Sequence, residues 1–526
     1  MKKLFLCLLI LSITSPLVAS CGAASNCSLK SCDSCDCAIN SKSFFTVRPH
    51  FQSGLPELVT AFRNERLDAR IDGCHGAVQA VIFGSISTDS EDLIRYFTPF
   101  CKTKLTIDSR PGEGDILAQH FNIYPTAIGE FFRSEISFEP KQTVIGLGLH
   151  YRQAFWRNEE KGRYFFFSVS SPLTHVRNKF SIHEQTLQSF ALDETADENV
   201  VTNMVEAFNQ KEWCYGKINS KIKGKCLRCP DQTKTRFADV ELKLGIAWVE
   251  HEPCHLESYI GVIIPTGNSA KGEFIFEPIV GYGDHWGFMS GTSIGATIWS
   301  SEESDCAIRA EYAIHSQYLF SNCQIRSFDL RNKPFSRYIE VYANKAQAEE
   351  ANALADPTLA KNLATPGINV FTRNANVTPG FSFNLTTAYV LNWGGFQGEV
   401  GYNFYARRAE CISLACPWKL GPALKSALGA GATNPVRDIT GNAQLETISM
   451  SLASYDANRI KAEDLDLASA AHPAGLSQTF FGALGYRWDE CEYPIFISGG
   501  GSYEYSIANS ATIDRWTIWG KVGLSF

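Results

Sequence analysis

Two short stretches of the chain carry residue patterns that can do chemistry. Residues 291–295 read G-T-S-I-G, a G-x-S-x-G pattern that can hold Ser293 as a nucleophile on a sharp turn between a strand and a helix. Residues 251–255 read H-E-P-C-H, an H-E-x-x-H pattern in which His251 and His255 can bind zinc from one face of a helix. Both chemistries require a helix at the pattern, so the elements that surround each pattern decide whether it can act.

The residues around both patterns predict strands and turns instead. Ser293 lies in a run whose apolar residues, from Ile294 to Ile298, alternate with polar or small ones, and such alternation is typical of a half-buried strand. In 251–255, Pro253 would remove a backbone hydrogen bond from the interior of a helix, and the segment lies between two strand patterns. We therefore expect a hairpin turn at 251–255, no catalytic residue, and neither a metal nor another cofactor.

Alternation of period two extends over most of the chain after residue 140. It predicts about fifteen strands, many of roughly nine to thirteen residues. Strands in soluble sheets typically have five or six residues, whereas nine to eleven are needed to cross a bilayer at a tilt. The predicted strands are 143–155, 163–171, 238–248, 256–265, 273–283, 289–300, 307–320, 335–343, 367–374, 380–391, 396–408, 445–455, 479–488, 494–505 and 514–526.

The two faces of these strands differ in chemistry. One face carries aliphatic and aromatic residues, and the other carries charges and many glycines. A charged Arg or Lys at the midplane of a bilayer costs about 2–4 kcal/mol, so the charged face must point into the lumen of a barrel. The lumen-lining candidates are Asp239, Glu241, Lys243, Arg309, Glu311, His315, Glu399 and Arg407. Mixed signs with a slight excess of acids predict a weakly cation-preferring or unselective aqueous channel. Alternatively, these residues pair with one another or with an inserted loop and seal the barrel.

The last residues of the chain, R-W-T-I-W-G-K-V-G-L-S-F, form an amphipathic strand pattern that ends on Phe526. This pattern resembles the terminal strand of Gram-negative outer-membrane β-barrels, whose final aromatic residue is read by the barrel assembly machinery. The resemblance covers about 140–526. It implies an all-β fold, a porin-like transmembrane antiparallel β-barrel over 141–526, located in the outer membrane.

Such barrels usually have an even number of strands, so we expect about sixteen, with fourteen or eighteen as alternatives. Either one predicted strand is wrong, or a strand from 44–140, such as F-F-T-V-R-P-H-F or A-V-Q-A-V-I-F-G, joins the wall. Residues 44–140 are otherwise interpreted as a plug-like region. Long helix-containing insertions are expected at 181–236, 344–366 and 409–444. Counting strands back from the C-terminus puts 409–444 on the periplasmic side, where connections are normally short, so a strand is hidden there or that loop is atypical.

The N-terminus has the features of an export signal. Lys2 and Lys3 precede a short apolar stretch, and V-A-S at 18–20 is a small-residue cleavage site, so 1–20 is interpreted as a signal peptide. With the next residue, Cys21, the site also resembles a bacterial lipobox, which makes Cys21 a lipidation candidate. Ordinary cleavage is the alternative.

The chain has 17 cysteines, and several crowd the segment 21–43. In an exported protein this number favours disulfides over zinc. The close pairs, and therefore the disulfide candidates, are Cys226 with Cys229 and Cys411 with Cys416.

Three classes of function fit these observations. The first is a porin-like channel for passive passage of small solutes, with outer-membrane lipid, solutes and the assembly machinery as partners and homo-oligomers left open. The second is a structural or adhesive surface protein linked by disulfides, and the third is a hydrophobic-ligand transporter. Fatty-acid-transporter-like barrels share the aromatic-rich strands, but their Asn-Pro-Ala signature is absent here. An outer-membrane lipase would need a Ser/His pair on the outer wall, and the formal net charge of −7 without a basic run speaks against nucleic acid.

Overall fold

The computed structural model describes residues 41–46, 48 and most of 76–526. The gaps after residue 76 are 100–101, 111, 122, 124, 126–128, 159–161, 191–201, 210–212, 216–217, 221–228, 252, 302, 332, 334, 339, 343, 354–364, 420, 425–435, 438–443, 446–458, 489 and 509–510. The chain divides into Met1–Asp33 and Ser34–Phe526, and every described residue lies in the second unit. The signal peptide, Cys21 and Cys226 therefore lie outside the described residues, as does nearly all of the strand predicted at 445–455.

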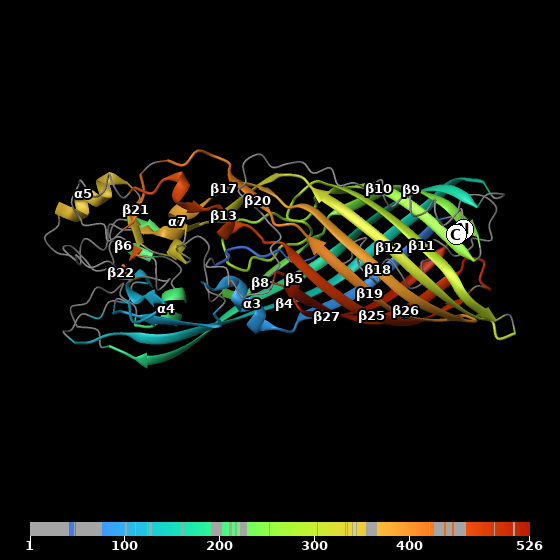
Figure 1. Cartoon of the computed structure of the whole chain (residues 1–526), viewed down its shortest axis with the longest axis horizontal. Helices are drawn as coiled ribbons and strands as arrows, with labels where there is room; N and C mark the ends of the chain where they lie inside the picture. The colour runs from blue at the N-terminus through green and yellow to red at the C-terminus, as the bar shows by residue number, and fades with distance from the viewer. Residues whose placement is uncertain are drawn as a thin grey trace. The chain divides into compact units, whose positions relative to one another are not determined.

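Antiparallel strands form a closed barrel of 12 strands (Figure 1). They follow one another in chain order around the wall, and pairing of the last strand with the first closes it. The wall strands are β1 Gly76–Ser87, β4 Arg133–Asn158, β5 Arg163–Gln188, β9 Val240–His251, β10 Cys254–Ile264, β11 Gly287–Ser301, β12 Cys306–Leu319, β18 Gly380–Trp393, β19 Phe396–Arg407, β25 Gly475–Trp488, β26 Ile495–Ala508 and β27 Arg515–Ser525.

The expected count of about sixteen strands was too high. The segment 273–283 is an irregular loop, whereas 335–343 and 367–374 contain short helices and short strands that lie outside the wall. Alternation of apolar and polar residues marks any extended segment with one buried face. It therefore does not distinguish a strand of the barrel wall from a short strand that packs on a core outside the wall. The segment A-V-Q-A-V-I-F-G lies in β1, between β27 and β4, so the wall begins at residue 76 rather than 141.

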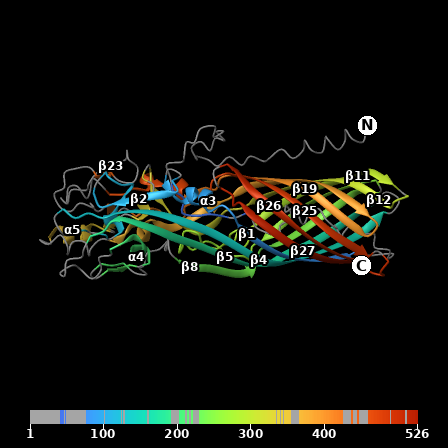
Figure 2. The same ribbon diagram turned by 90° about the horizontal axis from the view of Figure 1, so that it is seen from below.

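The two ends of the barrel differ in their connections. At one end the turns are short, for example 394–395, and at the other end the connections are long (Figure 2). The connection 408–474 belongs to the long-loop end, because β19 pairs directly with β25. No strand separates those two in the wall, so the expected periplasmic position of 409–444 was wrong.

Side chains on the outer face of the wall are apolar and exposed. Leu244, Val400 and Ile518 are 60%, 64% and 69% exposed. Exposed aromatic residues lie at both ends of this belt: Phe237, Trp286, Phe320 and Trp516 at the long-loop end, and Trp156, Trp299, Trp393 and Trp488 at the short-turn end. An apolar band between two aromatic girdles is the architecture of an outer-membrane β-barrel, whose short turns face the periplasm and whose long loops face the cell exterior.

Inside the wall, large rings lie against glycines of the neighbouring strand. A Cβ atom at Gly146 would lie 2.2 Å from Cζ of Phe83, and one at Gly245 would lie 2.1 Å from Cζ of Phe166. Each ring occupies the space that a side chain at the glycine would need. Rings and glycines together fill the inner face of this strongly curved sheet.

The long connections fold into a cap with its own apolar core. Strands β4 and β5 extend beyond the barrel into this cap, where Phe138 and Phe180 join the core. Helix α3, Ser90–Phe97, is capped by the Asp89 side chain, which accepts from the backbone N–H of Asp92, and buries an apolar face in the same core.

The remaining elements of the long connections are short. The strands are β2 Lys104–Asp108, β3 Ile116–Leu117, β6 Trp213–Tyr215, β7 Ile218–Ser220, β8 Cys229–Phe237, β13 Asn322–Ser327, β14 Asp329–Leu330, β15 Glu340–Tyr342, β16 Thr365–Pro366, β17 Thr372–Thr378, β20 Cys411–Leu414, β21 Ala423–Leu424, β22 Val436–Arg437, β23 Gln444–Leu445 and β24 Leu465–Asp466. The helices are α4 Met204–Asn209, α5 Lys345–Ala353, α7 Gly367–Phe371 and the 3-10 turns η3 Ala118–Phe121, η5 Ser336–Tyr338, η6 Ala462–Asp464 and η7 Leu467–Ala470. No helix in the described part of the chain combines the length and the apolar character of a membrane span.

Candidate functional site

The segment 41–46, which precedes the barrel in the chain, is packed into the cap at the long-loop end. Oγ of Ser41 donates to Oδ2 of Asp329 at 2.9 Å, and Nη2 of Arg337 donates to the carbonyl oxygen of Ser41 at 2.7 Å. Arg337 and Asp329 also form a buried ion pair with each other. The ring of Phe45 packs edge-on against Tyr96, with centroids 4.8 Å apart. Polar and apolar contacts together anchor this segment.

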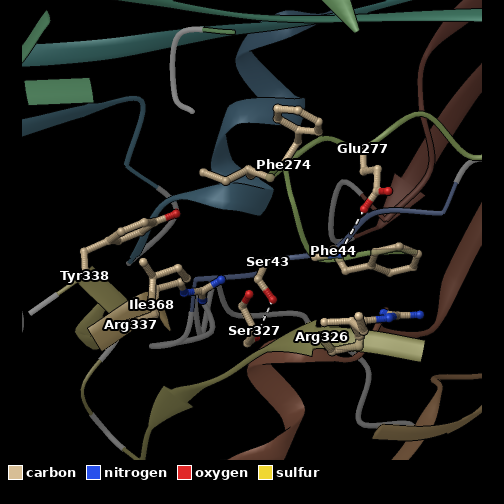
Figure 3. A pocket seen from close by; sticks show the side chains of 12 residues that line it. Ser43, Phe44, Phe274, Glu277, Arg326, Ser327, Arg337, Tyr338 and Ile368 are labelled. Carbon is tan, nitrogen blue, oxygen red and sulfur yellow. Dashed lines mark hydrogen bonds between the residues drawn. The ribbon is translucent and has the colours of Figure 1, made fainter. Parts of the chain in front are cut away.

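Ser43 and Phe44 form one side of a small pocket in the cap (Figure 3). Oγ of Ser43 donates to the carbonyl of Ser327 at 2.6 Å, and the guanidinium of Arg326 lies 3.2 Å from the centroid of the Phe44 ring. Burial lowers the pKa of Arg326, while the Glu410 carboxylate, 3.2 Å away, raises it. The pocket is thus lined by groups that already bind one another, and the N-terminal segment is part of that lining.

Arg48, which follows the same segment in the chain, lies in the lumen. Its Nη1 lies 3.3 Å from Oε1 of Glu504, and its Nη2 donates to Oδ1 of Asn384 at 2.7 Å and to Oδ1 of Asn403 at 2.8 Å. These three partners come from β26, β18 and β19, and the Arg48 guanidinium also lies 4.7 Å from the centroid of the Tyr405 ring. One side chain therefore ties the segment to three strands of the wall.

Residues of the wall provide the other partners of the Glu504 carboxylate. Nη2 of Arg515 lies 2.7 Å from Oε2 of Glu504, and Oγ of Ser477 donates to its Oε1 at 2.6 Å. Nη1 of Arg515 donates to the carbonyl oxygen of Arg48 at 3.1 Å. Both the side chain and the backbone of Arg48 are thus held in a buried network, with the carboxylate between two guanidinium groups.

A second network lies between the inner wall and the loop 265–286. Asp239 accepts backbone hydrogen bonds from Thr266, Gly267 and Tyr282 of this loop. Oη of Tyr282 donates to Oε1 of Gln317 at 2.8 Å. The loop is therefore pinned to the inner wall by a wall carboxylate and a wall amide.

A third network lies closer to the short turns. His255, Arg309 and Glu311 are in mutual contact: Nε2 of His255 lies 3.3 Å from Oε2 of Glu311, and Nη2 of Arg309 lies 3.5 Å from its Oε1. Arg152 of β4 pairs with Glu257 of β10 at 2.9 Å. Oppositely charged groups thus meet across the inner surface at this level too.

All eight predicted lumen residues lie on the inner face of the wall or at its rim. Of those not yet described, Lys243 lies 3.5 Å from Glu241, and Nδ1 of His315 lies 2.7 Å from Oη of Tyr259. Glu399 is 5% exposed, and Nη1 of Arg407 donates to the carbonyl of Thr46 at 3.2 Å. The structure therefore brings most of these residues into contact with one another, with the loop 265–286 or with the N-terminal segment.

The G-x-S-x-G and H-E-x-x-H patterns of the sequence lie on strands or between them. Ser293 lies within β11 and faces inward, 3% exposed, opposite Glu257 of β10. Residues 251–255 span the turn from β9 to β10, and His255 points into the lumen. Among the described residues no cluster of His, Cys, Asp or Glu could hold a metal ion.

Of the cysteine candidates, Cys411 begins β20 and Cys416 follows it in the cap with an exposed, free thiol, so these two are not joined by a disulfide. Cys229 begins β8, where its backbone pairs with Phe180. The expected Cys411–Cys416 pairing was wrong, because closeness in sequence does not by itself give the Cα and Cβ geometry of a disulfide.

Phe526 closes the wall beside Gly76. The backbone N–H of Gly76 donates to the carbonyl of Phe526 at 2.7 Å, and the N–H of Phe526 donates to the carbonyl of Gly76 at 2.9 Å. The Phe526 ring covers Gly76 and stacks on Tyr151, with centroids 6.5 Å apart.

The sequence analysis missed Arg48, Glu504 and Arg515. Glu504 and Arg515 share the inward parity of their predicted strands, so the argument that selected the other charges could have found them. No local signal marks Arg48, because its partners lie more than 300 residues away in the chain.

The sequence matches no family model and no curated protein. Among solved structures, the chain is similar to the transport unit of the autotransporter AIDA-I from Escherichia coli, with 7% identity, 88% of this chain and 92% of that chain covered, and a TM-score of 0.31. It is also similar to a Pseudomonas aeruginosa FadL homologue (9% identity, 91% and 94% covered, TM-score 0.27) and to the Ralstonia pickettii toluene transporter TbuX (7%, 86% and 89%, TM-score 0.27). Similarity at this level assigns no function to the chain.

Proposed function

We propose that this outer-membrane barrel is a structural surface protein. On this proposal the barrel anchors the loop cap in the membrane and presents the cap at the cell exterior. The observation that carries the proposal is the path of the N-terminal segment: residues 41–46 bind within the cap, and Arg48 is fixed inside the lumen. The proposal includes no enzymatic step.

The charges of the lumen support this function over that of an open porin. A water-filled channel needs inner side chains that face solvent, yet Glu311, Glu399 and Glu504 are 6%, 5% and 4% exposed. Breaking such buried pairs by removing one partner costs about 3–5 kcal/mol, so the pairs stabilise a filled interior. Passage of solutes would require the segment around Arg48 to leave.

The test is the position of the N-terminal segment in whole cells. A protease site placed directly before Ser41 should be cut by protease added to intact cells, whereas the same site between Gly394 and Gly395, in a short turn, should be cut only after the outer membrane is permeabilised. Wild-type protein in a planar bilayer should show no steady porin-like conductance. Protection of the site before Ser41, or a steady open channel in the wild type, would refute the proposal.

A further inference from the structure

Like charges face each other directly on the outer side of the wall. Lys141 of β4 is the cross-strand partner of Lys179 of β5, and Arg177 of β5 is the partner of Thr143. Like charges in directly opposite positions of an antiparallel pair destabilise it, so this arrangement needs an explanation.

These side chains point away from the barrel interior. Lys141, Arg177 and Lys179 are exposed, whereas their chain neighbours Gln142 and Asn178 are buried. Nε2 of Gln142 donates to Oδ1 of Asn178 at 2.8 Å on the inner face. Because successive residues of a strand point to opposite faces, the basic residues lie together on the outer face.

Carboxylates of the described chain do not neutralise the two lysines. Neither Lys141 nor Lys179 has an ion pair within 4.0 Å among the described residues. Two acids lie on the same face of β4: Glu139 is 3.3 Å from His183, and Glu135 is 3.9 Å from Lys104. His175, on the other side of Arg177, binds Thr235 at 2.7 Å. Among the side chains that the structure describes, no carboxylate pairs with either ammonium group.

The position of these residues matches the headgroup region of a bilayer. The continuous apolar belt of the outer face ends towards the long loops at Ile145 on β4 and Leu173 on β5, which are 58% and 39% exposed. Arg177 and Lys141 lie four residues beyond them, roughly 13 Å along tilted strands at about 3.3 Å per residue. The polar region of one leaflet is roughly 5–8 Å thick, so the basic residues lie at or just above it.

We propose that Lys141, Arg177 and Lys179 bind the phosphorylated headgroup of a lipid in the outer leaflet. The Arg177 guanidinium can bind phosphate oxygens in a bidentate manner, and the two lysines add charge from neighbouring positions. Thr143, directly opposite Arg177, adds a hydroxyl group. The acyl chains of the same lipid would lie on the exposed apolar side chains below, so the site is continuous with the lipid-facing belt.

The test uses the full chain in phosphatidylcholine nanodiscs doped with diphosphorylated lipid A or with its dephosphorylated form. Native mass spectrometry then counts the glycolipid that remains on each barrel after detergent extraction. Wild type should retain the phosphorylated lipid and lose the dephosphorylated one. Lys141→Gln with Lys179→Gln should weaken retention roughly thirtyfold, because each basic residue at a charged lipid surface contributes about one factor of five.

Two variants control for charge and for folding. Lys345→Gln with Lys461→Gln removes two charges from exposed lysines of the cap and should leave retention unchanged. Lys141→Arg with Lys179→Arg keeps the charge and should keep retention, while heat-modifiable gel migration verifies the barrel in every variant. Equal retention of both lipid forms by wild type, equal loss in the cap control, or displacement of the lipid by inorganic phosphate at low concentration would overturn the proposal. If the double Gln variant fails to fold, the wild-type comparison of the two lipids and the Arg variant decide by themselves.

Discussion

Replacing Arg48 with Ala should release the N-terminal segment from the lumen while the wall stays intact. The Arg48 side chain binds residues of β18, β19 and β26, and its carbonyl accepts from Arg515, whereas the other described bond of the segment to these strands joins the Thr46 carbonyl to Arg407. The strands pair with each other through backbone hydrogen bonds that do not involve Arg48. We therefore expect a closed wall with a more open lumen.

The size of the effect follows from the contacts that are lost. Removing one partner of a buried ion pair typically costs about 3–5 kcal/mol, but Glu504 keeps Arg515 at 2.7 Å and is not left as an unpaired charge. The main loss is then the pairing of two buried amide oxygens, on Asn384 and Asn403, at about 1–2 kcal/mol each. A total of about 2–4 kcal/mol raises the ratio of released to bound segment roughly 30- to 700-fold.

Conductance in planar bilayers measures this ratio directly. Arg48→Ala should show frequent openings where wild type shows almost none, and Arg48→Lys should be intermediate, because an ammonium can approach Glu504 but cannot span both asparagines. Arg163→Ala is the matched control: Arg163 is exposed near the short turns and donates to the carbonyl of Trp248. Identical traces for wild type and Arg48→Ala would refute the view that this segment closes the lumen, and equal openings in Arg163→Ala would point to general loosening of the barrel.

Three other outcomes are expected. Deleting Phe526 should lower the amount of heat-modifiable barrel in the outer membrane, because the pairing with Gly76 and the ring over it are lost together; a normal amount would contradict this. In reconstituted barrels, Glu311→Cys should react slowly with a water-soluble maleimide, because position 311 faces inward. Tyr312→Cys should react with a lipid-soluble maleimide, because position 312 faces outward. The reverse pattern would show that the register of this strand is wrong. Burial holds the pKa of His472 well below its usual range, so the unfolded state binds the proton first and the cap should lose stability as pH falls below about 6.5, by at most about 1.4 kcal/mol per unit. Hydrogen exchange of the cap between pH 7.5 and 5 measures this, and His472→Gln should remove that part of the pH dependence.

The wall could be predicted from sequence because its two faces meet two different environments. Lipid on one side and polar contacts on the other impose a period of two over the whole length of each strand, as in β12 and β18. The boundaries of these strands, and the alternation of Glu311 and Tyr312 between inside and outside, follow from that pattern. The cap could not be separated from the wall in the same way, since a short strand such as β17 also alternates, with Ala375 and Val377 buried against the cap core.

The contacts of Arg48 in the lumen could not be predicted, because they join distant parts of the chain. Arg48 meets Asn384, Asn403 and Glu504 only after the barrel has formed around it. The sequence shows each of these residues as a polar group in its own segment, and an inward-facing charge looks the same whether water or another side chain will meet it.

The error in the strand count and the expectation of an open channel have a common physical cause. The diameter of a barrel grows with the number of its strands, so sixteen strands enclose a wide aqueous lumen, whereas twelve enclose a much narrower one. In the narrower barrel, charges of strands that are not neighbours come within contact distance: Arg152 of β4 reaches Glu257 of β10, although the two strands β5 and β9 lie between them in the wall. Charges that would line a channel in a sixteen-stranded barrel therefore pair with one another in the twelve-stranded one, and the inner wall also binds the loop 265–286 and Arg48. The same inner residues thus favour an open porin in a wide barrel and a structural protein with a filled interior in a narrow one. Conductance of the Arg48 variant therefore tests both interpretations at once.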